Sequence, residues 1–372
     1  MSSSSRTGPA RSRPIRSEGH VEHRRGMAGL GFAAVLVALC VALALSIILA
    51  VTLGPADISP GTAWRIVIHQ FRPDAVPADW LAAHERIVWY VRLPRALLAV
   101  LVGATLAVVG TVLQAMVRNP LADPTILGGT SGAAVGAVSV IVLGWAFAGT
   151  FTLPVAAFAG GLVGYGLAFL LANSARGLSP LRMVLAGIAV SFLFSALTSM
   201  LIFMSEQSQT ARLALFWMLG ALGGARWDRL GLPAVLLVVG LVYLQARARA
   251  LNLLLFGDET ATSMGVPPDR LRRILFVVVA LLTGTSVALA GGVGFVGLVI
   301  PHGARMVVGA DHRRVLPLAA LVGAFFLLWS DVAARLVIAP RELPIGVITA
   351  LVGAPVFALL LRYRLRESDY AR

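Results

Sequence analysis

The chain has 372 residues, of which 58% are hydrophobic and 13% are charged, and its net charge is +14. Soluble domains carry about 25% charged residues, so this composition excludes a water-soluble globular protein and indicates one that uses lipid as solvent. The positive charges lie in tails and loops between apolar runs, which fits orientation in a membrane rather than binding to nucleic acid. All 31 basic residues are arginine, and a chain without lysine cannot form the P-loop of an ATPase.

The first 26 residues are rich in serine, arginine and proline and show no apolar periodicity. We interpret this segment, 1–26, as a disordered, basic cytoplasmic tail. The apolar run that follows, at 27–51, is too long for the hydrophobic region of a signal peptide and precedes no convincing cleavage site. We therefore predict that it is the first transmembrane helix.

Nine further apolar runs approach the roughly 20 residues that a transmembrane helix needs. They lie at about 95–116, 126–148, 152–173, 182–204, 229–246, 273–291, 294–309, 315–337 and 344–362. A shorter run at 213–224 fits a re-entrant or interfacial helix better than a span. The sequence thus predicts an all-α polytopic membrane protein. Ten transmembrane helices and one short re-entrant helix form a single domain over 27–364, and a cytoplasmic C-terminal tail follows at 365–372.

The placement of the arginines predicts the orientation of this domain. If ten helices cross the membrane, both termini lie on one side, and 21 of the 31 arginines fall in the tails and loops of that side. The positive-inside rule assigns that side to the cytoplasm. We therefore expect a multi-pass protein of the cytoplasmic (inner) membrane with both termini cytoplasmic. Three G-x-x-x-G patterns predict helix pairs whose backbones approach closely: Gly132/Gly136, Gly160/Gly164 and Gly220/Gly224.

Three stretches are more particular than a generic membrane helix. The first begins with Arg92-Leu-Pro-Arg95 and ends with Arg118-Asn-Pro-Leu-Ala-Asp-Pro-Thr-Ile-Leu-Gly128. The second is Leu255-Phe-Gly-Asp-Glu-Thr-Ala-Thr-Ser-Met-Gly-Val266. The third comprises Gly291-Gly-Val-Gly-Phe-Val-Gly-Leu-Val-Ile-Pro-His302, Asp311-His-Arg-Arg314, Glu342-Leu-Pro-Ile-Gly346 and Gly353-Ala-Pro355. In this order and spacing, the three stretches resemble the permease family of importers for iron-siderophores, haem and vitamin B12, the FecCD/BtuC-like type II ABC importers.

The resemblance covers about nine-tenths of the chain and implies a BtuC-like fold with a transport role and no covalent catalysis. It implies a second permease subunit, identical or not, together with cytoplasmic ABC ATPase subunits and an extracytoplasmic substrate-binding protein. The implied cargo is an iron-siderophore-type chelate that reaches the cytoplasm by alternating access, with haem or cobalamin as alternatives. We expect no cofactor and no metal site, because the single cysteine, Cys40, lies in an apolar run and nothing in the sequence suggests a ligand set.

Arg92 and Arg95 lie at the outer end of the second predicted span. Either they anchor this helix end at the interface, or they pair with carboxylates of a binding protein, to which the guanidinium fork is suited. The resemblance implies docking of the binding protein for these two residues and for Arg335. Asp331 is four residues before Arg335 and shares its helix face. A simple intrahelical ion pair of these two residues is therefore an equal alternative to docking by Arg335.

The loop between the sixth and seventh predicted spans contains a short helix in a segment at about 255–268. Acidic residues stand in its first turn, where the helix dipole favours them, and a glycine ends it. The segment could be a simple loop helix, but the resemblance implies the coupling helix that sits in a cleft of the ATPase. The residues implied in this contact are Gly257, Asp258, Glu259, Ala261, Met264 and Gly265.

The turn at Asn119–Pro124 would form for steric reasons alone, because two prolines with Asn and Asp end a helix. The resemblance adds an inner gate, formed by Asn119 and Leu121 together with Pro180 and Leu181. We expect the transport path to run along the interface of two permease subunits. The span at 182–204 and the run near 216–224 would line it.

A secondary transporter driven by protons or sodium is the first alternative function. Such transporters place ionisable groups in the middle of the membrane, whereas predicted spans two to seven carry Asp, Glu or Arg only near their ends. Asp331 is the lone candidate for an ionisable group that could couple transport to an ion gradient. A membrane-embedded enzyme would need a cluster of His, Asp, Glu or Cys at the membrane boundary, and the sequence shows none. We therefore expect that a separate chain hydrolyses the ATP.

Overall fold

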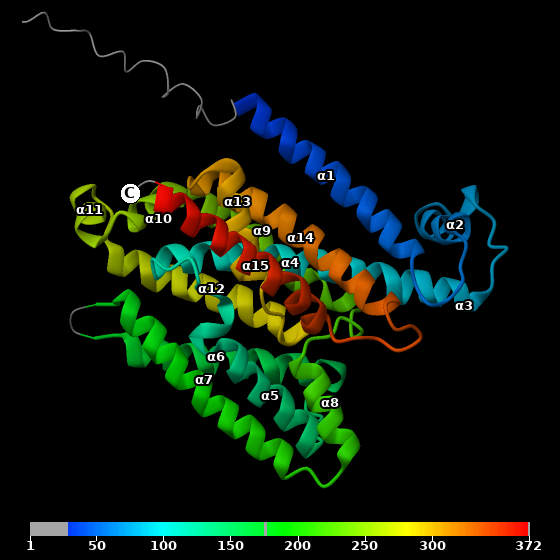
Figure 1. Cartoon of the computed structure of the whole chain (residues 1–372). Coiled ribbons are helices and arrows are strands. Elements are labelled where there is room, and N and C mark those ends of the chain that lie inside the picture. Colours follow the sequence, from blue (N-terminus) through cyan, green and yellow to red (C-terminus); the bar gives the residue numbers. More distant parts are fainter. Residues whose placement is uncertain (1–28, 175–176, 371–372) are drawn as a thin grey trace, which may run out of the picture.

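The computed structural model describes residues 29–174 and 177–370, so the predicted tail at 1–26 lies outside the described residues. Within this part of the chain the structure is helical and contains no strand (Figure 1). The α-helices are, in order, α1 (Gly29–Thr52), α2 (Pro60–Phe71), α3 (Ala82–Glu85), α4 (Leu93–Met116), α5 (Gly129–Leu143), α6 (Thr152–Ala172), α7 (Pro180–Phe203), α8 (Ser208–Met218), α9 (Gly231–Ala246), α10 (Ala248–Leu255), α11 (Asp258–Ser263), α12 (Pro268–Ala290), α13 (Val296–Val308), α14 (His312–Leu336) and α15 (Ile345–Tyr370).

Shorter helical segments connect several of these helices. A π-helical segment at Arg86–Arg92 joins α3 to α4, so one helical stretch runs from Ala82 to Met116. The 3₁₀ segments are Pro73–Ala75, Pro124–Leu127, Gly149–Phe151 and Trp227–Arg229. The last helix, α15, continues to Tyr370 and therefore passes the point at which we expected the C-terminal tail to begin.

Each of the ten predicted spans coincides with a helix, but only seven described helical segments are long and apolar enough to cross a membrane. The apolar parts of the other three are shorter: Gly129–Leu143, Val296–Val308 and Ile345–Leu360. At 1.5 Å per residue, the 13 residues of α13 extend about 20 Å, against the roughly 30 Å of a hydrocarbon core. The predicted count of ten complete spans is therefore not confirmed. The short helix expected at 213–224 is α8, which begins and ends about five residues earlier.

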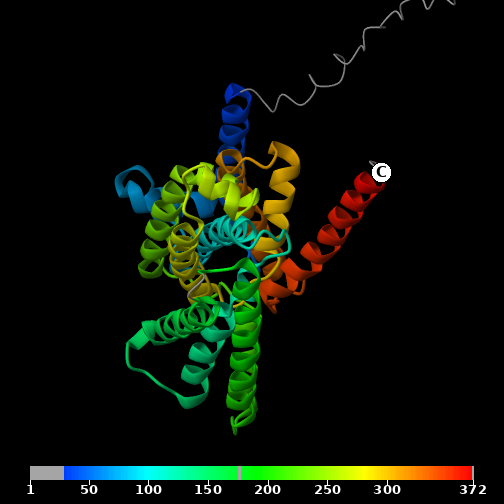
Figure 2. The same ribbon diagram turned by 90° about the vertical axis from the view of Figure 1, so that its left-hand side faces the viewer.

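The centre of the bundle is α4, which is apolar and buried on almost every side. Figure 2 shows it surrounded by the other helices, and α12, α13 and α14 pack along it. Two glycines of α4 make this approach close. A Cβ added at Gly103 would meet the carbonyl oxygen of Gly323 on α14, and one at Gly110 would meet that of Gly297 on α13. Small residues therefore bring the three backbones together, as the composition of membrane helices favours.

Two of the three G-x-x-x-G patterns pair with each other between α5 and α6. A Cβ at Gly132 would meet the carbonyl oxygen of Gly160, and a Cβ at Gly164 would meet that of Gly128. The predicted close approach is confirmed for this helix pair. It is wrong for Gly220/Gly224, because both residues lie in the loop that follows α8 and not in a helix.

The helices end at two opposite faces of the bundle, which we name by a feature of each. At the α11 end, Arg272 near the start of α12 donates to the carbonyl oxygens of Met116, the last residue of α4, and of Leu178, just before α7. At the Arg92 end, Arg92 and Arg335 bond the end of α1, so α1, α4 and α14 meet there. The first residue of α1 and the end of α15 both point toward the α11 end (Figure 1). The two described chain ends therefore lie on the same side, as ten crossings would require.

Backbone hydrogen bonds join three non-helical segments inside the bundle. Ala221 N donates to the carbonyl oxygen of Ala290 at the end of α12 (2.8 Å), and Ile345 N at the start of α15 donates to that of Gly220 (2.9 Å). Gly220 has φ +83° and Gly291 has φ +69°, a region that favours glycine. Irregular backbone at membrane depth is tolerated where protein covers it, and this junction explains why α13 and α15 begin partway along the bundle.

Candidate functional site

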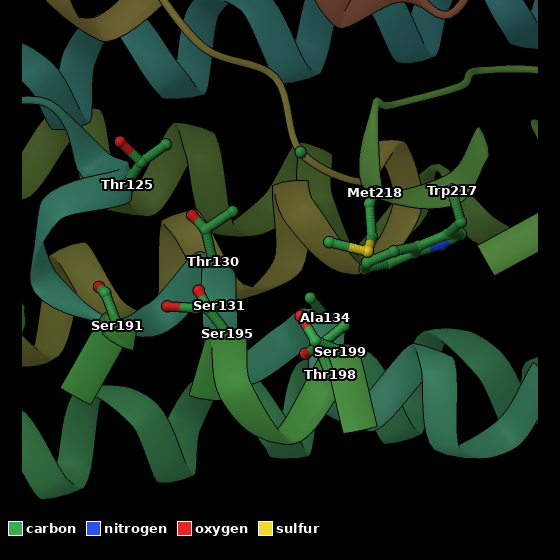
Figure 3. Close-up of a pocket in the computed structure, with 11 residues that line it drawn as sticks. Thr125, Thr130, Ser131, Ala134, Ser191, Ser195, Thr198, Ser199, Trp217 and Met218 are labelled. Atoms are coloured by element: carbon green, nitrogen blue, oxygen red, sulfur yellow. The ribbon is translucent and has the colours of Figure 1, made fainter. Parts of the chain in front are cut away.

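A cavity of about 300 Å³ opens between α5, α7 and the end of α8 (Figure 3). Most of its lining residues carry a hydroxyl group, two are the large side chains of α8, and the full set is Thr125, Thr130, Ser131, Ala134, Ser191, Ser195, Thr198, Ser199, Trp217, Met218 and Gly292. None of these residues is charged. The cavity therefore offers hydrogen-bond donors and acceptors together with an aromatic and a thioether surface, but no net charge.

The hydroxyls of α7 form a stripe along one face of that helix. Ser191, Ser195 and Thr198 are four and three residues apart, which is the spacing of neighbours on a helix surface. Figure 3 shows the stripe facing Thr130 and Ser131 of α5. The Thr198 hydroxyl donates to its own helix, at the Phe194 carbonyl oxygen (2.8 Å). The buried Ser191 Oγ has no hydrogen-bond partner among the described residues, so its hydrogen-bonding capacity is unused in this conformation.

The cavity joins the two segments that we expected to line a transport path. The predicted span at 182–204 supplies the α7 stripe, and Trp217 and Met218 belong to the predicted run near 216–224. The contribution of α5 and of Thr125 was not predicted. The spacing of the α7 hydroxyls is a signal that could have identified the lining from the sequence, because a polar stripe on an apolar span faces protein or water rather than lipid.

The three arginines predicted to dock a binding protein lie together at the Arg92 end, and all three are buried. Their exposed fractions are 4% for Arg92, 5% for Arg95 and 4% for Arg335. The Arg92 guanidinium donates to three carbonyl oxygens of residues 51–56, at 2.6–3.2 Å. Arg335 donates to the carbonyl oxygens of Leu53 and Ala50. Both side chains therefore fasten α4 and α14 to the end of α1.

Asp331 links the two other members of this cluster. Its Oδ1 accepts from Arg95 Nε (2.8 Å), and its Oδ2 lies 3.1 Å from Arg335 Nε, one helical turn along α14. Arg95 Nη1 also donates to both carboxylate oxygens of Glu342 (3.0 and 2.9 Å). The intrahelical pair of Asp331 with Arg335 was predicted, whereas the bond to Arg95, which is 236 residues away in sequence, was not. A carboxylate on a partner could reach these guanidinium groups only in exchange for internal bonds.

The expected short helix of the 255–268 segment is α11. Asp258 and Glu259 occupy its first turn, and Gly265, with φ +80°, ends it, as predicted. Gly257 precedes it with φ +109°. Ala261 is buried against the bundle, whereas Met264 exposes 63% of its surface. The helix is thus attached by one face and presents a large apolar side chain on the other.

A buried arginine that the sequence analysis did not single out holds this helix in place. Arg272 donates to both carboxylate oxygens of Asp258, from Nη1 (2.8 Å) and from Nη2 (2.6 Å). This hydrogen-bonded pair holds the pKa of the Asp258 carboxyl below its ordinary value. Arg272 lies on the apolar face of α12 with Leu275, Phe276 and Val279, and a charge on such a stripe is the signal that could have identified it.

The predicted gate residues lie at the α11 end. Asn119 Oδ1 accepts from Leu121 N (2.9 Å), which forms the expected turn, and Pro180 is the first residue of α7. Leu121 and Leu181 expose 47% and 67% of their surfaces. The structure therefore brings both predicted gate loops to the end of the bundle that carries α11. Among the described residues, no group of three His, Cys, Asp or Glu side chains could hold a metal ion.

Comparison with known proteins identifies relatives over most of the chain. Residues 40–363 match the FecCD transport family. The chain is 43% identical over 286 residues to the vitamin B12 import system permease protein BtuC of Salmonella paratyphi A, covering 77% of this chain and 86% of that protein. It is 44% identical over 284 residues to the cobalamin import system permease protein BtuC of Halobacterium salinarum, covering 75% and 74%.

The fold also has solved counterparts. A structure described as a metal-chelate type ABC transporter in an inward-facing conformation matches with a TM-score of 0.77 and 32% identity, over 89% of this chain and 99% of that chain. PsaBC from Streptococcus pneumoniae matches with a TM-score of 0.52 and 18% identity, which concerns the fold alone. The family match spans most of the chain, and the helices superpose on those of an ABC permease. The chain therefore belongs to the FecCD transport family and is a multi-pass membrane protein with a BtuC-like ABC permease fold.

Proposed function

We propose that this protein is the membrane subunit of an ATP-driven importer whose cargo is a corrinoid of the vitamin B12 class. The observation that carries the choice of cargo is the uncharged, hydroxyl-lined cavity between α5, α7 and α8. The relatives described as vitamin B12 or cobalamin permeases, at 43–44% identity, support the same cargo. The siderophore that the sequence led us to expect is not confirmed by these comparisons.

The chemistry of the cavity suits a corrinoid because the rim of that macrocycle carries neutral amide groups. Serine and threonine hydroxyls can donate to amide oxygens and accept from amide nitrogens, and Trp217 and Met218 offer surfaces for the apolar ring edge. A multiply anionic ferric chelate would lose its hydration in a site without a cation to replace it, which is costly. The neighbour described as a metal-chelate transporter makes a ferric chelate the second candidate, and charge is the property that separates the two.

The proposed assembly has a second permease subunit, cytoplasmic ABC ATPases and an extracytoplasmic binding protein. The cavity opens on one side of α7, whose Phe192 and Phe203 are 74% and 90% exposed, and a second copy packed there would complete a path between the subunits. ATP would favour one conformation of the assembly by binding it more tightly than the other. The α11 end would then face the cytoplasm of the inner membrane, which also places both termini there.

At the α11 end, we assign ATPase contact to Gly257, Asp258, Glu259, Met264 and Gly265. Ala261, which the sequence analysis included in this set, is 0% exposed and attaches α11 to the bundle instead. The exposed Met264 beside an acidic first turn gives this short helix an apolar and a charged contact for a partner. Asn119, Leu121, Pro180 and Leu181 remain our candidates for the inner gate. The two exposed leucines suit this role, because apolar side chains from two subunits can close a pore by excluding water.

At the Arg92 end, docking of the binding protein by Arg92, Arg95 and Arg335 stays a proposal that has to account for their burial. A pull-down with the binding protein tests it. We expect Arg92→Gln to weaken binding more than Arg341→Gln, which removes an exposed arginine at the same end. If only the Arg341 variant binds less, the buried arginines fasten helices together and an exposed surface does the docking.

Cargo selection is tested in proteoliposomes that contain this chain, its ATPase and its binding protein. We expect ATP-dependent uptake of cyanocobalamin and none of a ferric tris-catecholate. Ser195→Leu places an apolar group in the cavity and should lower cobalamin uptake, whereas Ser139→Ala, on α5 outside the cavity, should not. Uptake of the anionic chelate in place of cobalamin would refute the proposed cargo.

A further inference from the structure

Arg272 is the largest side chain that is completely buried in the described part of the chain, with 0% exposure. Besides its two bonds to Asp258, its Nε donates to the carbonyl oxygen of Met116 (3.3 Å) and its Nη1 to that of Leu178 (3.3 Å). These partners belong to three segments that are far apart in sequence: α11, the end of α4 and the loop before α7. One guanidinium group therefore joins α11 to residues that shortly precede both predicted gate segments.

Two residues near the start of α12 bond the backbone of Leu178, one at its N–H and one at its carbonyl oxygen. Asp269 Oδ1 accepts from Leu178 N (3.1 Å), and Arg272, three residues later, donates to Leu178 O. Leu178 is itself 1% exposed, and a Cβ at Gly177 would collide with the Asp269 carboxylate. The loop before Pro180 is thus hydrogen-bonded to α12 at Leu178, three residues before the predicted gate residue Leu181.

A second arginine reinforces the same attachment from the other gate loop. Arg118 Nη2 lies 3.5 Å from Asp258 Oδ1, and Arg118 has φ +52°, a conformation that non-glycine residues rarely adopt. Arg118 stands directly before Asn119. Asp258 on α11 is therefore bonded to one arginine rooted in α12 and paired with another in the first gate loop.

We propose that Arg272 is a positioning residue that makes α11 and both gate loops move as one unit. The proposal rests on the function proposed above, in which α11 contacts the ATPase and the two loops form the inner gate. A buried guanidinium cannot release one partner without leaving charge or polar groups unpaired. When the ATPase displaces α11, the bonds to Met116 and Leu178 carry that displacement to the loops instead of allowing α11 to swing alone.

Spin labels test the rigidity of this unit directly. In a Cys40→Ser background, spin labels at Thr262 on α11 and at Leu181 in the first turn of α7 report the intrachain distance between these two positions. It is measured in the assembled complex without nucleotide and with ATP bound. We expect the same distance distribution in both states, and a shifted or broadened one for Arg272→Met. A distance that changes between nucleotide states in the unmutated complex would overturn the proposal, as would an unchanged distribution in the variant.

Transport per ATP hydrolysed is the second readout, because a residue that only supports folding would not change it in assembled complexes. Coupling between two sites changes equilibrium affinities by about 5-fold or more. We expect Arg272→Met to reduce the cargo moved per ATP hydrolysed by at least about 5-fold. ATP hydrolysis itself should persist. Arg272→Lys keeps the charge but not the forked geometry of the guanidinium group. Its cargo moved per ATP should lie between the values of the unmutated complex and of Arg272→Met. Arg273→Gln, which removes the exposed neighbouring arginine, is the matched control and should couple normally.

A double variant keeps the test valid if Arg272→Met alone does not assemble. Arg272→Met with Asp258→Leu removes the buried charge of Arg272 together with its partly exposed partner, whose side chain is 42% exposed. Neither member of the pair is then left unpaired, so this variant should fold yet remain uncoupled. Normal transport per ATP in an assembled Arg272→Met or double-variant complex would refute the positioning role while leaving the proposed function intact. No ATP-driven uptake by the unmutated complex would instead refute the proposed function.

Discussion

Replacing Asp331 by asparagine should destabilise the protein strongly, because this carboxylate neutralises two buried arginines. Its exposure is 0%, it accepts a 2.8 Å bond from Arg95, and it forms a 3.1 Å ion pair with Arg335. Asparagine keeps the shape of the side chain but removes its charge. Removing one partner of a buried pair costs about 3–5 kcal/mol.

The neighbouring carboxylate provides a comparison at the same site. Glu342 also bonds Arg95, but its side chain is 39% exposed, so water screens this pair and Glu342→Gln should cost about 1 kcal/mol or less. For chains of 150–250 residues, 1 kcal/mol corresponds to about 2–4 °C in Tm, and the shift per kcal/mol is smaller for longer chains. We therefore expect the Asp331→Asn variant to melt roughly 5–10 °C lower and the Glu342→Gln variant about 2 °C lower.

Size-exclusion chromatography of detergent-solubilised protein after heating measures both Tm values on the same preparation. The reasoning depends on the contrast between a buried and a half-exposed carboxylate on one arginine. Equal shifts for the two variants would refute it, as would a larger shift for Glu342→Gln.

Two further predictions follow from the packing and from the α11 attachment. Gly160→Leu should prevent stable assembly of α5 against α6, because its side chain would meet the Gly132 backbone, whereas Gly166→Leu on the same helix has open space; the yield of monodisperse protein measures both. The folded-state pKa of Asp258 is below its unfolded value, so the stability that its charge contributes is present above the unfolded pKa of about 4 and is lost as pH falls below it. A mobility probe on α11 should therefore be unchanged between pH 8 and pH 5 and become more mobile only below about pH 4; increased mobility already at pH 6 would contradict the assignment.

The sequence predicted the all-α class, and each of the ten apolar runs that it predicted as spans coincides with a helix. Lipid favours such runs because the backbone of a membrane helix must form its hydrogen bonds internally. The run at 294–309, which contains α13, is already the shortest and weakest of the ten predicted spans, but the sequence could not predict that α5 is too short to cross alone. Their apolar runs continue through Gly144 and Gly291–Phe295 without remaining helical, and a run of apolar residues does not reveal where protein replaces lipid around the backbone.

The candidate site was predictable in its local parts and not in its long-range contacts. The α11 helix with its acidic first turn and terminal glycine follows from rules that act within a few residues. The bond of Arg95 to Asp331 and the bonds of Arg272 to Met116 and Leu178 span large sequence separations, and nothing in local sequence specifies such partners. The burial of the three Arg92-end arginines was missed for the same reason. Arg92 and Arg335 donate to carbonyl oxygens at and just after the end of α1, which carry no side-chain signature, and the carboxylate acceptors of Arg95 are more than 230 residues away in sequence.

The most direct test of the account is the energy source of cobalamin uptake by the reconstituted complex. Proteoliposomes containing this chain, its ATPase and its binding protein should accumulate cyanocobalamin only when ATP is supplied on the ATPase side, and dissipating the proton gradient should leave the rate unchanged. Uptake driven by a proton or sodium gradient through this chain alone, without an ATPase, would contradict the assignment as the membrane subunit of an ATP-driven importer.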